Sequence, residues 1–171
     1  MKKIVSYMMT GILLLSFLLT GCGSPEPQTG KKMSMYYINT AETKVEVHEQ
    51  YLNTKTLDEQ LDETMRYLST TPEKLEYKAP LDMGFHVLDY EVEDGKLLIN
   101  VDKAYSELSP TTEVLVRAAI VRTLTQLPNV KYVGITVEDS QLYDNAGEMV
   151  GWMNADQFIN NDGNEINTLS L

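Results

Sequence analysis

The sequence predicts an α+β fold in which two helices pack on one face of a mixed β-sheet, in the order β-α-β-β-α-β. Three observations lead to this class. Two segments, beginning near residues 56 and 109, carry helix-start signals and apolar residues at three- and four-residue spacing. Strand-like stretches flank them, and a hairpin signal lies between them. One sheet covered by two helices is the simplest arrangement that buries the apolar face of each element against another element.

Two strands are expected at the start of the folded part. Residues 33–39 are rich in aromatic and β-branched side chains, which favours a first strand. Residues 44–52 alternate polar and apolar side chains through Val45 and Val47, which favours a half-buried second strand. An extended loop is the alternative for this second segment.

The first helix is expected to begin at Thr56, because Thr56-Leu57-Asp58-Glu59 has the form of a capping box. Pro72 ends the helix, and residues 73–84, which contain Pro80 and show no clear period, are expected to form an irregular crossover. The residues at helical spacing that form its apolar face are Leu57, Leu61, Met65 and Leu68.

A hairpin and a second helix follow. Apolar runs at residues 85–92 and 97–101 flank Asp94-Gly95, a pair that adopts positive φ at low cost in tight turns. Ser109 and Pro110 then provide a cap and a first helical residue, and Pro128-Asn129 stops the helix.

The last core strand is expected at residues 130–138, where Val133, Ile135 and Val137 alternate with other side chains. The segment after it is less regular. Its apolar residues could add an edge strand, namely Met149, Val150, Trp152 and Met153.

The N-terminus has the layout of a secretory signal: Lys2 and Lys3 precede a run, residues 4–19, that holds no charged side chain. Leu19-Thr20-Gly21-Cys22 resembles the lipobox of bacterial lipoprotein signals. This resemblance implies cleavage between Gly21 and Cys22, and attachment of a diacylglyceryl group, with acyl chains such as palmitate, to the Cys22 thiol. An uncleaved anchor or a buried cysteine is the alternative. Because Cys22 is the only cysteine, no intramolecular disulfide can form.

The expected organisation is a signal peptide at residues 1–21, a flexible tether at 22–33, one domain at 34–158 and a frayed tail at 159–171. The chain carries 25 acidic and 14 basic side chains, and two of the basic ones lie in the signal. This balance repels phosphate, so nucleic acid is excluded as a partner.

The span from Tyr51 to Phe158 resembles the GerMN, or Germane, domain of sporulation and germination lipoproteins. The resemblance is carried by the strand at residues 98–102 with Tyr105, the helix at 118–127, the Pro128-Asn129-Val130 stop and the strand at 133–137. Many members have a glycine just after that last strand, where Asp139 stands here, and the sporulation protein has two copies of the domain. The resemblance implies a small interaction module, similar to ring-building domains of spore envelope channels, with no known catalysis.

No catalytic or metal-binding set is evident, so we expect no enzyme activity, no metal and no cofactor. His48 and His86 are the only histidines and lack further ligands at metal-site spacing. Residues 160–165 resemble a calcium loop only superficially, because the first and last ligand positions would be Phe158 and Leu169. A solvated helix face explains the acids at residues 58–63 better than a cation site does. Two acids such as Asp102 and Glu113, lying about 5 to 9 Å apart in a cleft, would indicate an enzyme instead.

Aromatic residues give the remaining indication of function. Tyr143 and Trp152 flank the turn-like residues 144–147 and are the candidates for an exposed interaction surface, whereas core packing is the alternative.

Taken together, these features of the sequence favour a lipoprotein anchored through Cys22 on the outer face of the cell membrane. There it would act as a protein interaction or assembly module, with oligomerisation possible, linked to sporulation or germination. The alternative is a lipoprotein that binds a small ligand or cell-wall glycan.

Overall fold

The structure is a computed structural model that describes residues 30–72, 76–144 and 146–158. The predicted signal peptide, the cleavage site at Gly21 and Cys22, and the predicted tail lie outside these residues and stay predictions. The described elements are β1 (Lys31–Asn39), β2 (Val45–Leu52), α2 (Leu57–Leu68), β3 (Tyr77–Lys78), β4 (Val87–Glu93), β5 (Lys96–Val101), the 3-10 helix η2 (Lys103–Glu107), α3 (Pro110–Leu124), β6 (Tyr132–Val137), β7 (Ser140–Gln141) and the 3-10 helix η3 (Ala155–Gln157).

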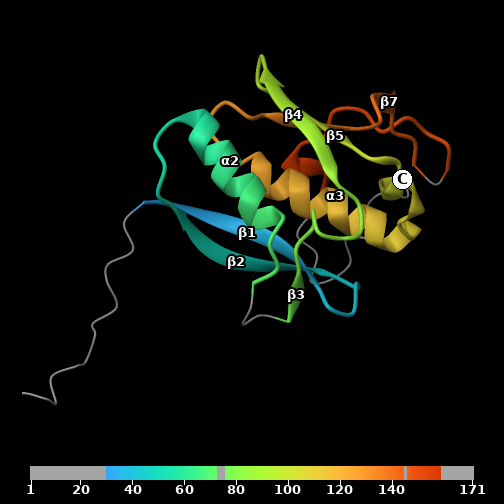
Figure 1. The fold of residues 1–171 in the computed structure, drawn as a ribbon, viewed down its shortest axis with the longest axis horizontal. Helices are drawn as coiled ribbons and strands as arrows, with labels where there is room; N and C mark the ends of the chain where they lie inside the picture. Colours follow the sequence, from blue (N-terminus) through green and yellow to red (C-terminus); the bar gives the residue numbers. More distant parts are fainter. Residues whose placement is uncertain (1–29, 73–75, 145, 159–171) are drawn as a thin grey trace, which may run out of the picture.

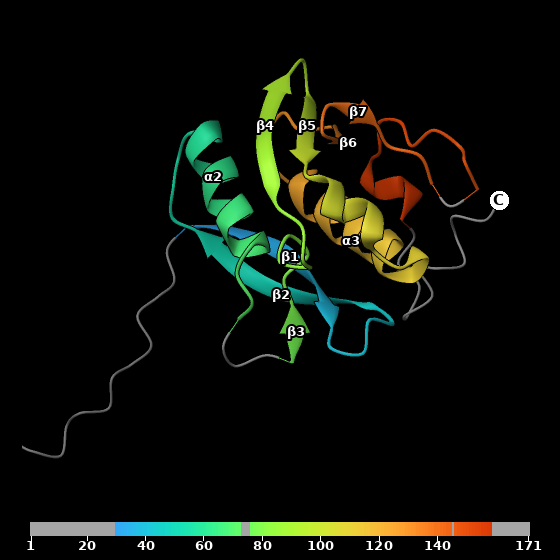
Figure 2. The same cartoon turned by 45° about the vertical axis from the view of Figure 1, so that its right-hand side comes forward.

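The α+β class is confirmed, but the described strands form two sheets where one was expected. The first sheet has the antiparallel order β2-β1-β3, and the second has the order β4-β5-β6-β7 with β5 and β6 parallel (Figures 1 and 2). The sheets are separate because α3 and Gln126 just beyond it cover the N-terminal part of the second edge of β1, whose C-terminal end pairs with β3. The Ser34 amide donates to Gln126 Oε1 at 3.0 Å, Gln126 Nε2 donates to the Ser34 carbonyl at 2.7 Å, and the Tyr36 amide donates to Thr123 Oγ1 at 3.0 Å.

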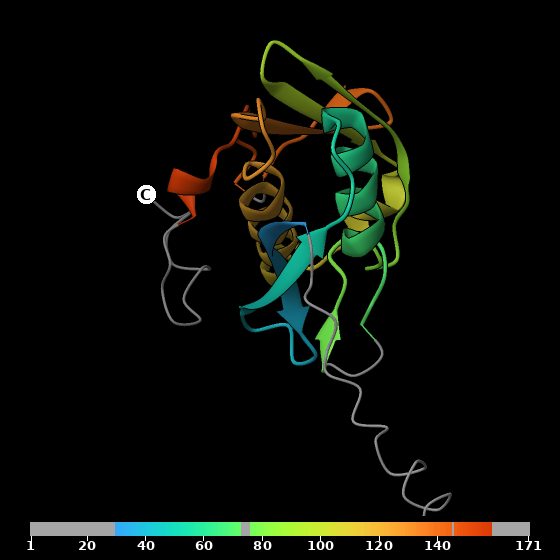
Figure 3. The same ribbon diagram turned by 90° about the vertical axis from the view of Figure 1, so that its left-hand side faces the viewer.

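Helix α3 lies at the centre of the molecule. Figure 3 looks nearly along its axis and shows the first sheet below it, the second above it, α2 on one side and η3 on the other. Twelve of its 15 residues are buried, so almost every side of the helix is covered. Ala118 and Ala119 are fully buried, and their small side chains allow this close approach. Helix α3 lies between the two sheets, and α2 packs beside it against β1 and β2 of the first sheet.

The local helix-start and turn signals act as predicted. Thr56 and Glu59 form the capping box of α2, and Ser109 caps α3 with Pro110 at its start. Asp94 and Gly95 adopt φ values of 49° and 80° in the β4–β5 turn.

A side-chain hydrogen bond joins β4 to α2. The Tyr90 hydroxyl of β4 donates to Asp62 of α2 at 2.7 Å, and burial together with this bond raises the pKa of Tyr90 to about 12.

Strand β1 begins at Lys31, so residues 31–33 belong to a strand and not to the predicted tether. Lys31 pairs with Leu52 and Lys32 with Tyr51 of β2, which extends the antiparallel ladder. The lysine side chains remain compatible with a strand because their ammonium groups reach outward: Lys31 Nζ donates to the Gln126 carbonyl and Lys32 pairs with Glu49.

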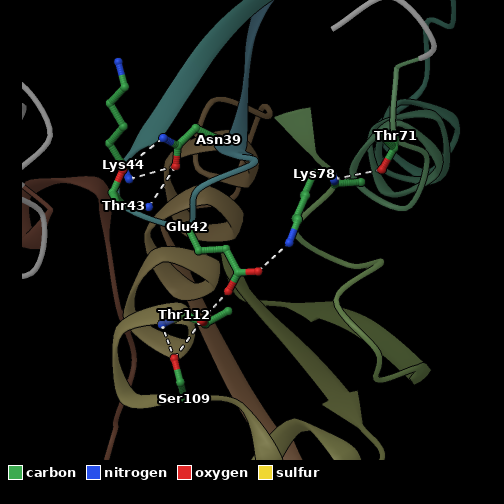
Figure 4. Close-up of polar contacts among 9 residues, drawn as sticks. Asn39, Glu42, Thr43, Lys44, Thr71, Lys78, Ser109 and Thr112 are labelled. Atoms are coloured by element: carbon green, nitrogen blue, oxygen red, sulfur yellow. Dashed lines mark hydrogen bonds and ion pairs between the residues drawn. The ribbon is translucent and has the colours of Figure 1, made fainter. Parts of the chain in front are cut away.

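Glu42, in the turn between β1 and β2, joins three elements (Figure 4). Its carboxylate accepts from Thr112 Oγ1 of α3 at 2.6 Å and from the Lys78 ammonium of β3. Glu42 has a φ of 52°, which is uncommon for a residue with a side chain. The hydrogen bond from Lys78, followed by that from Thr112, lowers the pKa of the Glu42 carboxyl.

The chain after β6 is held by short pairings instead of a continuous edge strand. Glu138 and Asp139 have positive φ in the tight turn to β7. Beyond β7, isolated bridges join Tyr143 to Met149 and Met153 to Val133. The predicted edge strand at residues 149–153 is therefore reduced to two contacts, because Gly151 and Trp152 between them do not extend the ladder.

Candidate interaction surface

The two predicted contact residues, Tyr143 and Trp152, are both exposed, at 60% and 42% of their surface. Met149 is exposed at 63% and is bridged to Tyr143, and it lines the same hollow as Trp152. We call these three residues, together with the half-buried Leu98 beside Trp152, the aromatic surface. The apolar neighbours of Met149 in the sequence indicate an edge strand there, and no local pattern marks Leu98.

The segment that presents this surface is pinned from below. Val150 and Met153 are buried, whereas Met149 and Trp152 point outward. The Val150 amide donates to the Leu142 carbonyl at 2.9 Å, and Gln141 Nε2 donates to the Val150 carbonyl at 2.6 Å. Met153 and Val133 exchange two backbone hydrogen bonds of 2.8 Å. The exposed side chains therefore project from a backbone that is fixed at two points.

Asp144 organises the turn between Tyr143 and Met149. Its carboxylate oxygen Oδ1 accepts from the amides of Ala146 and Glu148, both at 2.9 Å. Its own amide donates to the Glu148 carbonyl at 2.8 Å. An aspartate that bonds to the following backbone in this way favours a turn, so Tyr143 and Met149 are held opposite one another.

Trp152 lies on the outer face of the second sheet, against Gly134 of β6. A Cβ atom at Gly134 would come within 2.8 Å of Trp152 Cζ3, so only glycine leaves room for the indole ring. Lys96 Nζ lies 5.3 Å from the centre of the same ring, within cation–π range. A hollow of about 150 Å³ remains between Trp152, Leu98 and the segment at residues 149–151.

Acidic side chains border the aromatic surface on the same face of the sheet. Glu91 stands directly opposite Leu98 in the β4–β5 register, and Glu93 stands opposite Lys96. Asp89 stands opposite Asn100, whose side-chain amide donates to the carboxylates of Asp89 and Asp139. The ion pairs within the described part of the chain join other positions, namely Lys32–Glu49, Lys44–Glu46, Lys78–Glu42, His86–Asp102 and Arg117–Glu113.

A buried ionic cluster supports the segment from the side of α3. Glu113 and Arg117 are 8% and 6% exposed, and two contacts of 2.6 and 2.9 Å join the carboxylate to the guanidinium. The Tyr105 hydroxyl donates to the same carboxylate at 3.0 Å, and complete burial raises the pKa of Tyr105 well above its usual value. Arg117 Nη1 reaches Met153 Sδ at 3.9 Å. The cluster thus connects α3 to the base of the aromatic surface.

The predicted acids and histidines do not gather into one site. Asp102 accepts a hydrogen bond in its pair with His86, with a 2.9 Å distance between Oδ2 and Nδ1, and this bond lowers the pKa of Asp102. Glu113 is bound to Arg117 instead, so the two acids serve different partners. His48 lies in β2 opposite Met35. Within the part of the chain that the structure describes, no three His, Cys, Asp or Glu side chains are placed to hold a metal ion.

Among residues 30–72, 76–144 and 146–158, no helix is both long enough and apolar enough to cross a membrane. Helix α3 is the more apolar of the two long helices, but it spans 15 residues and is enclosed by the rest of the domain. A membrane-crossing helix needs roughly 20 apolar residues.

Comparison with known proteins identifies relatives of this fold. Residues 34–143 match the Germane family, described as "Sporulation and spore germination". The first GerMN domain of the sporulation protein GerM from Bacillus subtilis is 14% identical, with a TM-score of 0.54, over 71% of this chain and 94% of that domain. The tandem GerMN domains of the same protein are 17% identical, with a TM-score of 0.52, over 79% of this chain. This chain spans about half, 49%, of the tandem structure. Curated proteins give no match.

Proposed function

This chain belongs to the Germane family of sporulation and spore germination domains, and from this premise we propose that it is a lipid-anchored envelope protein of spore-forming cells. In this proposal it acts by binding another protein through the aromatic surface, and it has no catalytic role. The anchor is the lipid on Cys22, and the domain sits on the outer face of the membrane. Family membership supports the link to sporulation or germination, whereas the anchor and the contact rest on the residues discussed below.

The lipobox Leu19-Thr20-Gly21-Cys22 supports the anchor. Two acyl chains on one sulfur hold a protein at a membrane, whereas a single chain binds only marginally. Changing Cys22→Ala is expected to move the protein from the membrane fraction to the medium or to leave it with its signal uncut. The circular dichroism spectrum should not change. Unaltered partition into detergent by the variant would contradict the anchor.

The aromatic surface is the observation that carries the proposed contact function. Tyrosine, tryptophan and methionine are enriched at protein interfaces because they bury much apolar area. Here three such side chains are more than two-fifths exposed and share one segment, although buried neighbours fix its backbone. A rigid segment loses little conformational entropy when it binds, which favours a contact site over a mobile loop.

Site-specific crosslinking in cells tests this function. A photoreactive phenylalanine analogue at Tyr143 is expected to give a crosslink to a protein partner during sporulation. The matched control is Val47 of β2, which is also half exposed, at 50%, but belongs to the first sheet. The proposal predicts crosslinks from position 143 and none from position 47. Equal crosslinking at both positions, or none at either, would refute a specific contact at the aromatic surface.

Binding of a glycan or small ligand remains the second candidate because Trp152 offers an exposed indole beside a hollow. Two hollows border this indole. The one beside Leu98 has a volume of about 150 Å³, and the one beside Arg117 and Phe158 has about 330 Å³, which reaches the lower end of the roughly 300 to 1,000 Å³ of common ligand sites. A soluble cell-wall fragment that changes the fluorescence of Trp152 in the absence of any protein partner would favour this second function.

A further inference from the structure

We propose that the partner contacts this surface with a basic polypeptide segment that carries at least one large apolar side chain. The apolar side chain occupies the hollow beside Trp152, and the lysine or arginine side chains face the carboxylates of β4. This inference rests on the proposed function, since it specifies the chemistry of the protein that the aromatic surface binds.

The first argument is the arrangement of charge on the outer face of the second sheet. Alternate residues of β4 point to this face, so Asp89, Glu91 and Glu93 form a row of carboxylates. Successive members of such a row are about 7 Å apart. All three residues are exposed, and none of them takes part in the ion pairs named above for the described part of the chain. We call this set the acidic row.

The second argument is that the acidic row and the aromatic surface are neighbours. Glu91 of the acidic row is paired with Leu98, and Leu98 lines the hollow with Trp152. Asp144 and Glu148 stand on the opposite border, in the turn between Tyr143 and Met149. An apolar centre with charged residues at its rim is the usual layout of a protein interface. In this interface the rim is almost entirely negative, with Lys96 stacked on Trp152 as the cation within it.

The third argument concerns which occupants the charge disfavours. A second copy that used the same surface would bring two acidic rows into one interface, because a two-fold contact uses the same surface of both copies. Anionic lipid headgroups would be repelled by the same carboxylates and by a chain of formal net charge −11. Charge complementarity therefore selects a cationic segment, and the hollow selects an apolar side chain within it.

Trp152 gives a direct readout because it is the only tryptophan in the chain. The full lipidated protein is reconstituted in phosphatidylcholine nanodiscs and titrated with the peptide Lys-Leu-Lys-Phe-Lys-Leu-Lys, acetylated and amidated at its ends. The matched peptide replaces each lysine with glutamate. The basic peptide is expected to shift the emission of Trp152 in a saturable way that weakens as salt increases. The acidic peptide is expected to leave the emission unchanged.

Charge-neutralising variants test the acidic row itself. The triple variant Asp89→Asn, Glu91→Gln, Glu93→Gln is expected to lower the affinity for the basic peptide by about fivefold to tenfold, since each exposed charge contributes a modest amount to binding. The control variant Asp58→Asn, Asp82→Asn, Glu107→Gln removes the same charge from exposed positions outside the surface. It is expected to change the affinity by less than about twofold. Thermal unfolding checks that both variants fold.

Several outcomes would overturn the inference. These are equal binding of both peptides, an equal loss in both triple variants, or an emission shift caused by adding phosphatidylglycerol to the discs without peptide, which would indicate a membrane contact. Failure here is distinguishable from failure of the proposed function. If the crosslink from position 143 to a protein persists while the peptides do not discriminate, the contact function stands and only the basic partner is refuted.

Discussion

At the scale of single residues, three positions make contacts that hold the described structure together. Gly134 makes room for Trp152, Glu113 neutralises a buried arginine, and Glu42 joins three elements. The partners of Gly134 and Glu42 are distant in sequence, whereas Arg117 lies one helical turn from Glu113. Substitutions at these positions therefore test the structure more sharply than changes on the exposed faces.

Gly134→Ala is expected to displace the indole ring of Trp152, because the added Cβ would lie 2.8 Å from Cζ3. The overpacking should cost about 1 to 3 kcal/mol of unfolding free energy. The emission of Trp152 should also shift, since the ring leaves its place over β6. In the Trp152→Ala background the same glycine substitution should cost much less. Equal costs in the two backgrounds would show that the ring does not rest on Gly134.

Glu113→Gln is expected to destabilise the domain by about 3 kcal/mol, because it leaves the buried Arg117 without its counter-charge. Replacing both residues, Glu113→Leu with Arg117→Met, should cost far less, since no buried charge is then left alone. Urea unfolding measures both values. A double variant that is as unstable as the single one would mean that the ion pair itself contributes the stability.

Glu42→Gln is expected to lower the unfolding free energy by about 1 kcal/mol at pH 7, through loss of the ion pair with Lys78. The pKa of Glu42 is lowered in the folded protein, so this stabilisation is present above the ordinary value of 4.5 and is lost as the pH falls through the lowered pKa. The difference between wild type and variant should therefore shrink below pH 4.5. A constant difference from pH 7 to pH 3 would contradict this assignment.

At the scale of elements, α3 and Gln126 just beyond it take the place of a strand along the N-terminal part of the β1 edge that pairs with β3 at its other end. Unpaired strand edges invite association with other chains, and helices or loops commonly cover them. Gln126, just beyond the end of α3, both donates to and accepts from the backbone of Ser34. The two sheets therefore stay separate, and their apolar faces meet on either side of one helix.

Gln126→Ala is expected to destabilise the domain by about 1 to 2 kcal/mol, because the amide and carbonyl of Ser34 lose their partner. Hydrogen exchange at the Ser34 amide should become faster. Thr125→Ala is the control, because the Thr125 hydroxyl bonds only to Val121 of the same helix in the described structure. Unchanged exchange at Ser34 in the Gln126 variant would show that the edge of β1 is protected by other groups.

The elements that the sequence predicts well are those set by local chemistry. The capping box at Thr56, the cap at Ser109 and the turn at Asp94-Gly95 each depend on residues within a few positions. The division into two sheets is not local, because it depends on Gln126 and Thr123 reaching a strand about 90 positions earlier. The burial of α3 on nearly all sides is likewise not local, because it depends on both sheets packing against one helix.

The candidate surface was predicted in part. Exposed aromatic side chains beside a turn indicated Tyr143 and Trp152, but Met149 was assigned to a strand because its neighbours are apolar. The signal that could have placed Trp152 on β6 is Gly134, since a glycine inside a strand often marks the close approach of another group. The acidic row could not be recognised from sequence, because it depends on the register that pairs Glu91 with Leu98.

At the scale of the whole molecule, the chain combines one Germane domain, an excess of acidic side chains and the proposed contact surface. The chain spans about half the length of the tandem GerMN structure that it resembles. A single domain presents one aromatic surface, so we expect its partner to provide any assembly into larger structures. In the proposed contact, the acidic row favours a partner whose binding segment is positively charged.

Protection of Met149 in living cells tests the central claim most directly. Met149 is exposed at 63%, so hydroxyl radicals should oxidise it readily in the purified protein. His86, whose side chain is 82% exposed and lies outside the surface, serves as the internal control. In sporulating cells we predict that oxidation of Met149 falls several-fold while that of His86 is unchanged. Equal oxidation of Met149 in cells and in the purified protein would contradict the claim that a partner covers the aromatic surface.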